Sequence, residues 1–205
     1  MMLSQYSLLL PQFKNDKYQK MKNLNKALLV MDMQLSILHS AADDATAFIG
    51  RVAETVKKAR AQQSPVIYVV LGFRNGLPEI SENNRMFMPF KTGLAEADMQ
   101  DWSAIHPDLT PEKGDIIVTK RRVSAFSGSD LEVVLRGLNI QHLVLTGIAT
   151  SGIVLSTLRE AADKDFELTV LSDCCYDRDE EVHRVLTEKV FPRQAEVLHL
   201  NDWLS

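Results

Sequence analysis

Residues 142–154 decide the fold of this chain, and they read His-Leu-Val-Leu-Thr-Gly-Ile-Ala-Thr-Ser-Gly-Ile-Val. The first five residues form a short, mostly apolar run that is typical of a buried strand, and a helical pattern begins near Gly152. The segment between them therefore predicts a strand-to-helix turn. Such a turn presents backbone N–H groups and the positive end of a helix to whatever lies above the sheet.

On both sides of this segment, apolar runs alternate with helical patterns along most of the chain. Strands are predicted at 27–31, 66–70, 115–119, 142–146, 168–171 and 196–200. Helices are predicted over 44–62 and from starts near Ser129, Gly152 and Asp179. Strands that alternate with helices predict a parallel sheet with right-handed crossovers. We therefore expect a three-layer α/β/α fold, Rossmann-like and doubly wound, around a six-stranded parallel sheet.

Local contacts are also expected at three helices. Ser129 followed by Glu132 three residues later matches a capping box at the start of a helix. Arg159 and Asp163 stand four residues apart and are expected to pair on the outer face of their helix. Ser151 is expected to act as the N-cap of the helix that starts at Gly152.

The size and composition of the chain indicate an ordinary globular protein. Its 205 residues suffice for one α/β domain, which we expect over 25–205, after a flexible N-terminal extension over 1–24. The net charge of −4 gives no electrostatic reason to expect a nucleic acid or an anionic membrane as partner. No run approaches the roughly 20 apolar residues that cross a bilayer. The only two cysteines, Cys174 and Cys175, are adjacent, so we expect no disulfide framework and a reducing, cytoplasmic compartment.

Residues 72–114 form a long, irregular connection that is rich in glycine and proline. Connections of this length are uncommon in compact domains and are usually functional. Its apolar side chains predict either one wall of a pocket or a separate small core under a surface loop, and the sequence leaves both open. Arg85 and Lys91 are possible contacts for a substrate carboxylate, with Arg85 better suited to a bidentate contact. The apolar residues are Met86, Phe87, Met88, Phe90 and Trp102.

Two charged residues come where predicted strands end. Asp32 follows the apolar run 27–31, and Lys120 follows the run 115–119. Ligands of such sheets bind at the carboxyl ends of the strands. A carboxylate after five apolar residues is poorly hydrated, so we expect the pKa of Asp32 to rise unless a cation such as Lys120 compensates. The pair is a candidate for general acid–base catalysis, and a solvated aspartate with an ordinary surface lysine is the alternative of equal weight.

Four motifs together resemble those of one known group of enzymes. They are Val-Met-Asp-Met-Gln at 30–34, Lys-Arg-Arg-Val-Ser-Ala-Phe at 120–126, Thr-Gly-Ile-Ala-Thr at 146–150 and Val-Leu-Ser-Asp at 170–173. In this order they resemble the isochorismatase-like hydrolase superfamily. That superfamily includes cysteine amidohydrolases, such as nicotinamidases and N-carbamoylsarcosine amidases, and isochorismatases proper. The resemblance runs over roughly residues 26–204.

The resemblance implies a doubly wound parallel sheet and a site of three positions. Asp32 matches the catalytic aspartate of the family, and Lys120 matches its catalytic lysine. The third position is the nucleophilic cysteine of a Gly-x-x-Thr-x-x-Cys turn, and counting from Gly147 through Thr150 places it on Ile153. Isoleucine cannot attack a carbonyl, so the covalent route is closed at this position. Isochorismatases proper also lack this cysteine and use acid–base chemistry centred on the aspartate.

The resemblance has further implications for the turn and for partners. A non-proline cis peptide is expected between Ile148 and Ala149. The N–H groups of the turn are expected to bind a substrate oxygen; they belong to Ile148, Ala149, Gly152 and Ile153. Gln34 and Phe126 lie in the matching motifs and are possible substrate contacts. A homo-oligomer, either a dimer or a tetramer, is implied. No cofactor is expected, and no metal is indicated because the nicotinamidase-type Asp-x-His pattern is missing at 71–76.

Three other sets of residues carry side chains with possible chemical roles. Ser151, Asp173 and His183 follow the Ser…Asp…His order of α/β-hydrolases, but the elbow consensus Gly-x-Ser-x-Gly is absent. Cys174 and Cys175 are expected as one buried residue and one that faces a loop, rather than as nucleophiles. The histidines show no spacing of metal ligands and are expected on the surface or in loops. They are His39, His106, His142, His183 and His199.

The sequence thus favours a hydrolase of a small anionic or amide-bearing metabolite, with Asp32 as general acid and base and Lys120 as its cation. The alternative is a degenerate member of the same fold that binds a ligand, or serves as a subunit, without catalysis. Ile153 motivates the alternative, because isoleucine is bulkier than the small residue expected in such a site. The charge pair favours the enzyme. Burying two charges lowers stability, and a catalytic role would explain why the pair is present.

Overall fold

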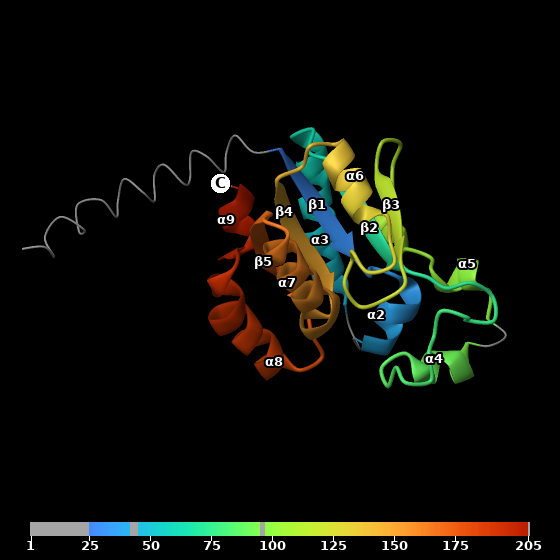
Figure 1. The fold of residues 1–205 in the computed structure, drawn as a ribbon. Helices are drawn as coiled ribbons and strands as arrows, with labels where there is room; N and C mark the ends of the chain where they lie inside the picture. Colours follow the sequence, from blue (N-terminus) through green and yellow to red (C-terminus); the bar gives the residue numbers. More distant parts are fainter. Residues whose placement is uncertain (1–24, 42–44, 95–96, 205) are drawn as a thin grey trace, which may run out of the picture.

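Strand β1, Lys26–Met31, lies inside a six-stranded parallel sheet in the computed structural model, which describes residues 25–41, 45–94 and 97–204 (Figure 1). The strand order is β3-β2-β1-β4-β5-β6. The sheet grows from β1 toward β3 on one side and from β4 toward β6 on the other, so the predicted doubly wound fold is confirmed. The other strands are β2 Val66–Leu71, β3 Ile116–Lys120, β4 His142–Ile148, β5 Glu167–Tyr176 and β6 Glu196–Leu198.

Helices cover both faces of the sheet and complete the three expected layers (Figure 1). Side chains of α3 and α9 join the core cluster on one face, and side chains of α6 and α7 join the cluster on the other. These four helices are α3 Thr46–Ala61, α9 Leu200–Leu204, α6 Leu131–Gly137 and α7 Leu155–Asp163. The other helical segments of the described residues are α2 Leu35–Ala41, α4 Met88–Gly93, α5 Met99–Trp102, η1 Pro107–Leu109, η2 Thr150–Val154, α8 Glu180–Val185, η3 Leu186–Val190 and η4 Phe191–Arg193.

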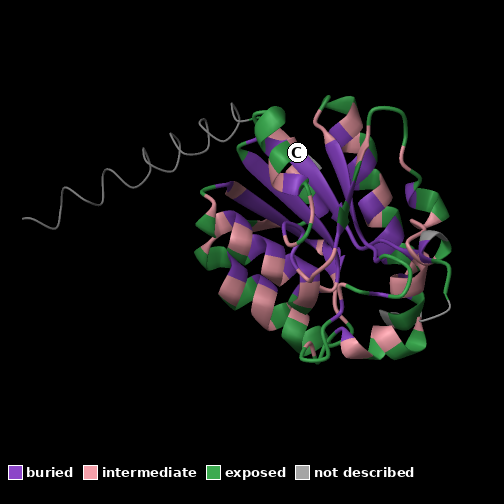
Figure 2. Cartoon of the chain, turned by 45° about the vertical axis from the view of Figure 1, so that its right-hand side comes forward, coloured by how far each residue is buried: buried purple, intermediate pink, exposed green. Residues whose placement is uncertain are grey.

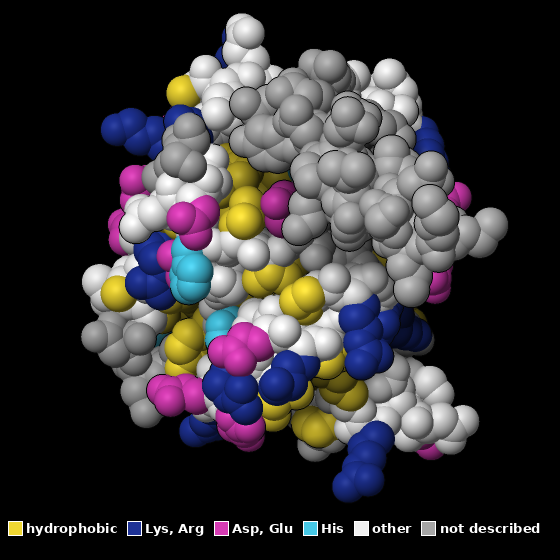
Figure 3. Space-filling model, turned by 90° about the vertical axis from the view of Figure 1, so that its left-hand side faces the viewer, with side chains coloured by type: hydrophobic (Ala, Val, Ile, Leu, Met, Phe, Trp, Pro, Cys, Tyr) yellow, Lys and Arg dark blue, Asp and Glu magenta, His cyan; other side chains and the backbone are white. Residues whose placement is uncertain are grey.

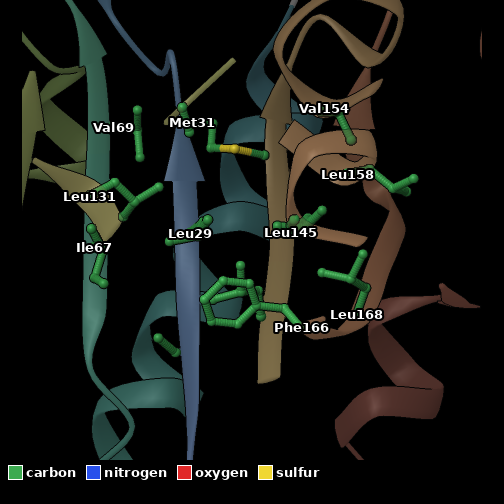
Figure 4. Close-up of a cluster of buried hydrophobic side chains, with 14 of the residues drawn as sticks. Leu29, Met31, Ile67, Val69, Leu131, Leu145, Val154, Leu158, Phe166 and Leu168 are labelled. Carbon is green, nitrogen blue, oxygen red and sulfur yellow. The ribbon is translucent and has the colours of Figure 1, made fainter. Parts of the chain in front are cut away.

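The side chains of β1 explain why both faces need a cover. Leu28 and Val30 pack into the cluster below α3, whereas Leu29 and Met31 pack into the cluster below α6 and α7. All four side chains are at most 1% exposed. A strand that is buried on both faces reads as a continuous apolar run, as 27–31 does. Figure 4 shows Leu29 and Met31 among side chains from neighbouring strands and helices, and Figure 2 shows the buried sheet between helices with exposed outer sides.

Gly147 allows β4 to lie very close to β1. Its φ is +136°, and a Cβ atom at this position would lie 2.2 Å from the carbonyl oxygen of Met31. Glycine alone combines that backbone conformation with that close approach. The hydroxyl of Thr146 also donates a hydrogen bond of 2.9 Å to the carbonyl oxygen of Leu29. The carboxyl end of β4 is therefore fixed beside the residue that precedes Asp32.

The connection over 72–114 contains a small core of its own, which confirms one of the two alternatives for this segment. Its aromatic rings contact one another: the ring centroid of Phe73 lies 5.9 Å from that of Phe87 and 6.1 Å from that of Trp102. Met86 is 57% exposed and does not take part. Only the short helices α4, α5 and η1 interrupt the irregular backbone of the described part of this segment. The buried residues of this core are Leu71, Phe73, Leu77, Ile80, Phe87 and Met99.

Strand ends differ from the prediction, and β5 differs most. It was expected over 168–171 but runs from Glu167 to Tyr176. Polar residues within it did not end the strand, because tertiary partners satisfy them. The Ser172 hydroxyl donates to the carbonyl oxygen of Leu198, and the Asp173 carboxylate accepts from the backbone N–H of Leu200. Cys174 and Cys175 consequently lie inside a strand, whereas the expected strand over 196–200 ends at Leu198.

The predicted capping box at the start of α6 is not formed. The Ser129 hydroxyl accepts a hydrogen bond from the N–H of Leu131, but the helix starts at Leu131 with Asp130 as the N-cap residue. Glu132 turns away from the cap and binds the ammonium group of Lys164 at 2.6 Å. A tertiary ion pair has therefore replaced the local reciprocal contact that the sequence predicted.

The predicted pair of Arg159 and Asp163 is also wrong. The guanidinium of Arg159 instead donates to the side-chain oxygen of Gln194, in the segment that precedes β6. This contact links α7 to a distant segment, which no pattern within one helix reveals. The extension expected over 1–24 lies outside the described residues.

Candidate active site

Asp32, Lys120 and the turn after β4 gather at the carboxyl edge of the sheet, where the strand order reverses between β1 and β4. Asp32 directly follows β1, Lys120 is the last residue of β3, and the turn that begins at Ala149 follows β4. Strand β2 separates β1 from β3, so Lys120 reaches across the end of β2 to meet Asp32. A crevice outside the carboxyl ends of the strands at such a switch point is where doubly wound sheets bind ligands.

Asp32 and Lys120 form a buried ion pair. The Lys120 Nζ lies 3.0 Å from the Asp32 Oδ2, and the two side chains are 2% and 9% exposed. The lysine also donates a hydrogen bond of 2.9 Å to the carbonyl oxygen of Arg122. The alternative of a solvated aspartate and an ordinary surface lysine is therefore wrong.

Only one oxygen of the Asp32 carboxyl is occupied. Its Oδ1 is buried and has no hydrogen-bond partner among the described residues. Burial raises the pKa of this carboxyl to about 6, and the charge and hydrogen bond of Lys120 oppose the rise. Asp32 also has a φ of +56°, a conformation that aspartate and asparagine tolerate better than most residues. The pair thus offers a proton donor or acceptor with an unused oxygen, poised near neutral pH.

Gln34 is fully buried and holds the end of β2. Its side-chain amide donates to the carbonyl oxygen of Leu71 at 2.9 Å and accepts from the Leu71 N–H at 2.7 Å. Both ends of the amide therefore bind the backbone of the strand that Lys120 crosses. Gln34 therefore fixes the backbone at the end of β2, and its predicted contact with substrate stays a prediction.

The turn after β4 has the expected cis peptide bond between Ile148 and Ala149. The N–H groups of Ser151 and Gly152 already have acceptors. The Gly152 N–H donates to the Ala149 carbonyl oxygen at 3.0 Å, and the Ser151 N–H donates to the Asp177 carboxylate at 2.7 Å. Gly152 is thus engaged within the turn, contrary to its predicted contact with a substrate oxygen. The roles predicted for the N–H groups of Ile148, Ala149 and Ile153 stay predictions.

The N-cap predicted for Ser151 is wrong. The helical turn η2 begins at Thr150, one residue before Ser151, and its N-cap residue Ala149 has no side chain that can cap it. The Asp177 carboxylate takes over this task from the segment after β5. A carboxylate at the N-terminal end of a helix is favoured by the partial positive charge there.

Ile153 lies at the position where the resemblance expects a thiol. It is 2% exposed and packs in the larger core cluster, together with Met31 and Val154. Thr150, three residues earlier, is fully buried, and its hydroxyl lies 2.8 Å from the Nδ1 of His183. The core packing of Ile153 therefore covers one side of the turn, and His183 of α8 contacts the other side through Thr150.

Arg85 and Phe126, which were predicted to contact substrate, differ in their burial. Arg85 is exposed in the loop before α4, where its role stays a prediction. Phe126 is 8% exposed, and its ring centroid lies 6.1 Å from that of Phe166, which directly precedes β5. Because Phe166 lies toward the amino end of a strand, Phe126 packs into the core rather than facing the carboxyl edge. The substrate contact predicted for Phe126 is not supported.

The other candidate nucleophiles lack the geometry or the ionisation that catalysis needs. His183 contacts Thr150 rather than Ser151, and Asp173 accepts from the N–H of Leu200, so no Ser–His–Asp triad exists. Cys174 and Cys175 are both buried, so the expectation that one faces a loop is wrong. Burial raises the pKa of Cys174 to about 12 and that of Cys175 well above its ordinary value, which keeps both thiols protonated.

His142 overturns the expectation that all five histidines lie on the surface or in loops. It is the first residue of β4 and is 5% exposed. Its Nε2 lies 2.9 Å from the hydroxyl of Thr169. Burial lowers the pKa of this imidazole to about 4, so the ring is neutral in the folded protein.

Asp177 and the contact between Thr150 and His183 are parts of the site that the sequence did not reveal. The strand before Asp177 was predicted five residues too short, so this carboxylate was not expected near the sheet edge. An acidic residue directly after the last strand position would have been the available signal.

In residues 25–41, 45–94 and 97–204, no three His, Cys, Asp or Glu side chains group as they would around a metal ion. Across the same part of the chain, no helix has the length and apolar character needed to cross a membrane.

Fold and site together define an α/β protein with a buried aspartate–lysine pair at the switch point of a doubly wound parallel sheet. The family model described as the isochorismatase domain matches residues 26–202. The chain therefore belongs to the isochorismatase family.

Individual relatives agree with this assignment. The chain is 31% identical over 182 residues to the uncharacterized isochorismatase family protein YecD of Escherichia coli O157:H7, with 87% of this chain and 94% of YecD covered. It is 33% identical over 177 residues to the ureidoacrylate amidohydrolase RutB of Stutzerimonas stutzeri, with 76% and 71% covered. A solved structure of an isochorismatase family protein from Burkholderia thailandensis superposes with a TM-score of 0.76 at 28% identity, covering 87% of this chain and 93% of that one.

Proposed function

We propose that this chain hydrolyses a small metabolite by acid–base chemistry at Asp32, without a covalent cysteine intermediate. The observation that carries the proposal is the Asp32 carboxyl, which is buried, has a pKa raised to about 6 and has an oxygen with no partner among the described residues. The Oδ2 is held by Lys120 at 3.0 Å. A catalytic group near neutral pKa with a vacant acceptor is what proton transfer at neutral pH requires.

In the proposed reaction, Asp32 acts first as a base and then as an acid. Its free Oδ1 takes a proton from a water molecule while the water oxygen attacks the electrophilic carbon of the substrate. The carboxyl then returns this proton to the leaving group, so that the elements of water are added across the broken bond. Lys120 keeps enough of the carboxyl ionised to start the cycle, and its charge stabilises negative charge that develops beside it.

The family relatives and the residue at position 153 suggest which substrates to test. RutB is named as an amidohydrolase that acts on ureidoacrylate, and RutB and this chain share 33% of their aligned residues. Amides, ureides and isochorismate are therefore the first compounds to test. Ile153 supports a route without a covalent intermediate, because its buried hydrocarbon side chain offers no nucleophile at the turn.

The decisive experiment is an activity screen of the purified protein and of Asp32→Asn against isochorismate and a panel of small amides and ureides. Asparagine keeps the size of the side chain and tolerates the φ of +56° at this position, so that the fold is retained. We expect turnover of at least one compound by the unmodified protein and its loss in the variant. Equal turnover by both proteins on every active compound would exclude the role of Asp32.

The second candidate function is ligand binding without catalysis, and the burial of Ile153 in the core favours it. Ile153→Cys separates the two candidates. If the unmodified protein turns over no compound and Ile153→Cys gains amidase activity, the charge pair is intact and the native chain is a binding protein. Turnover by the unmodified protein removes this second candidate.

A further inference from the structure

The Asp32 oxygen that the proposed reaction uses is closed off from solvent. The accessible surface of its Oδ1 is below 1 Å². The side chain of Lys120, which holds Oδ2, is 2% exposed. Hydrolysis needs a water molecule and a substrate carbon beside Oδ1, and neither can reach an atom that has no accessible surface. A segment next to the charge pair must therefore move before hydrolysis at Asp32 begins.

Two of the segments beside the pair are fixed to the main body of the domain. The turn after β4 packs Ile153 into the large core cluster. The loop after β3 is bound to α7, because the Thr157 hydroxyl accepts from the N–H of Ala125 at 3.0 Å. Glu160 of the same helix accepts from the Ser124 hydroxyl at 2.6 Å. Moving either segment would break contacts of the core or of α7.

Residues 73–94, the first half of the connection after β2, are attached less firmly. Their buried side chains pack in the small core of the connection, apart from both clusters of the sheet. In the part of the chain that the structure describes, the polar contacts that leave this segment are made by Glu79. Its carbonyl oxygen accepts from the Arg122 guanidinium at 2.7 Å, and its carboxylate lies 3.5 Å from the Arg121 Nε. Figure 1 shows α4 of this segment beyond the carboxyl ends of the strands, apart from the helices that cover the sheet.

Both attachments of segment 73–94 lie beside the lysine of the charge pair. Arg122 binds the Glu79 carbonyl through its side chain, and its own carbonyl accepts from the Lys120 Nζ at 2.9 Å. Just before the segment, the Gly72 N–H donates to the carbonyl oxygen of Lys120 at 3.2 Å. The Gly72 carbonyl oxygen accepts from Arg121 at 2.8 Å. The segment thus leaves the sheet beside Lys120 and contacts the same loop again at Glu79.

We propose that residues 73–94 form a lid over Asp32 and Lys120, which Glu79 holds closed by its contacts with Arg121 and Arg122. Opening of the lid breaks these two contacts and leaves both sheet clusters intact, because the lid carries a core of its own. Water and substrate then reach Oδ1, and closure excludes bulk solvent from the reaction. The need for opening rests on the proposed hydrolase function, whereas the attachment of the lid through Glu79 does not.

The first test measures opening of the lid without any substrate. The unmodified full chain is treated with sulfo-NHS acetate at constant pH, and mass spectrometry follows the acetylation of Lys120. Because this amine is buried, its labelling rate reports how often the site opens. Glu79→Ala removes the contact with Arg121, and Arg122→Leu removes the donor to the Glu79 carbonyl. Each variant should raise the labelling rate of Lys120 about tenfold.

Glu181→Ala is the matched control. It removes a carboxylate that pairs with Arg184 at 2.7 Å. This residue belongs to α8, on the side of the molecule where acidic, basic and histidine side chains are mixed (Figure 3). The control should label at Lys120 as slowly as the unmodified protein. Equal labelling rates in the control and in both lid variants would overturn the proposal.

Hydrogen exchange separates opening of the lid from loosening of the whole domain. In Glu79→Ala, the backbone amides of 73–94 should exchange faster than in the unmodified protein. The amides of β1 and β4 should exchange at unchanged rates, because their contacts lie in the sheet clusters. Equal acceleration of the strands and of 73–94 would show global destabilisation and would contradict a lid that opens by itself.

A reversible crosslink tests the closed state. Glu79→Cys combined with Arg121→Cys is joined by a short bis-methanethiosulfonate reagent, which a reductant releases. The two native thiols are buried and do not compete for the reagent. The crosslinked protein should label at Lys120 more slowly than the unmodified protein, and reduction should restore labelling. Each single cysteine variant with the same reagent is the control. Labelling that the crosslink leaves unchanged would exclude this lid.

The crosslink also tests turnover of any substrate that the screen identifies. It should lower kcat/KM about tenfold or more, and the reductant should restore the activity. If no compound is turned over, the proposed hydrolysis fails, and the labelling of Lys120 still decides whether the lid exists. If the crosslinked protein keeps full turnover, the lid is wrong while the hydrolase function stands.

Discussion

Ion pairs occur at both edges of the sheet, and they differ in whether each carboxylate oxygen has a partner. At the amino edge, the Arg60 guanidinium binds Asp115 at 2.5 Å and Glu112 at 2.6 Å. The N–H of Glu112 also donates to the Asp115 Oδ2 at 2.8 Å, and the Arg60 Nε donates to the Oδ1 at 3.5 Å, so each oxygen has a partner. At the carboxyl edge, Asp32 has Lys120 on one oxygen and no partner among the described residues on the other.

This difference separates a structural role from a chemical one. A carboxylate with a protein partner on each oxygen joins α3 to the start of β3. A carboxyl with a vacant, buried oxygen is costly for stability, because a buried acceptor without a donor retains its desolvation penalty. Such a cost is typical of sites where a substrate or water molecule completes the hydrogen bonding. The comparison predicts that Asp→Asn lowers activity at the carboxyl edge. At the amino edge, the same substitution should lower stability and leave activity unchanged.

The largest effect is expected from Asp32→Asn on activity. Removing the general base should lower kcat/KM by about 10²–10⁴-fold on an active substrate. Steady-state kinetics on the compound found in the screen provide the measurement. Binding of that compound should be retained, which isothermal titration calorimetry can check. A loss below about tenfold would place Asp32 outside the proton transfer.

Asp115→Asn is the matched substitution at the amino edge. It removes the charge that pairs with Arg60, so the free energy of unfolding should fall by about 1–3 kcal/mol. Urea denaturation followed by circular dichroism gives this value, and kcat/KM should be unchanged. A variant that is as stable as the unmodified protein but inactive would reverse the roles assigned to the two edges.

His142 makes the amino edge sensitive to acid. Its pKa is near 4 in the folded protein and 6.5 in an exposed histidine, so the unfolded chain binds a proton at higher pH than the folded chain does. The stability that depends on the neutral ring is complete above pH 6.5 and is lost as the pH falls through this window. The loss from pH 7 to pH 5 should be about 2 kcal/mol. The same measurement on His142→Gln should lack this component, and an equal loss in both proteins would refute it.

The smallest effect concerns how kcat/KM depends on pH through Asp32 at the carboxyl edge. The free enzyme needs Asp32 ionised, and the pKa of this carboxyl is about 6. We therefore expect kcat/KM to rise with pH and to reach its plateau above pH 7, with a value about tenfold lower at pH 5. His183→Asn, which removes the imidazole beside Thr150, should retain this limb. A profile that falls with rising pH would instead assign the protonated carboxyl as the starting form.

Much of the fold could be predicted because each strand carries its own signal. The runs at 27–31 and 66–70 are apolar at every position, which is possible only for strands that are covered on both faces. The positions of Asp32 and Lys120 at strand ends could also be predicted from the runs that precede them. Parallel strands bring their carboxyl ends to one edge, so the two residues were expected to lie near each other. The end of β5 could not be predicted from the sequence, because Ser172 and Asp173 are polar and their hydrogen-bond partners belong to the segment 198–200.

The contacts of the site were less predictable than its location. Thr150 and His183 are 33 positions apart, and Ser151 and Asp177 are 26 positions apart. Neither pair follows a helical or strand period, so no local pattern indicates the contact. Phe126 illustrates the reverse case: it lies in a motif of the site, yet its ring packs against Phe166 in the core.

The sequence by itself determined the α/β class, the parallel sheet, the family and the position of an aspartate and a lysine at its carboxyl edge. These properties depend on the order and the period of residues along the chain. Only the tertiary structure decided that Lys120 occupies one oxygen of Asp32, that the other oxygen has no partner among the described residues, and that α8 holds the turn at Thr150. These features depend on distances of about 3 Å between segments far apart in the chain, and such distances are fixed by packing of the whole domain.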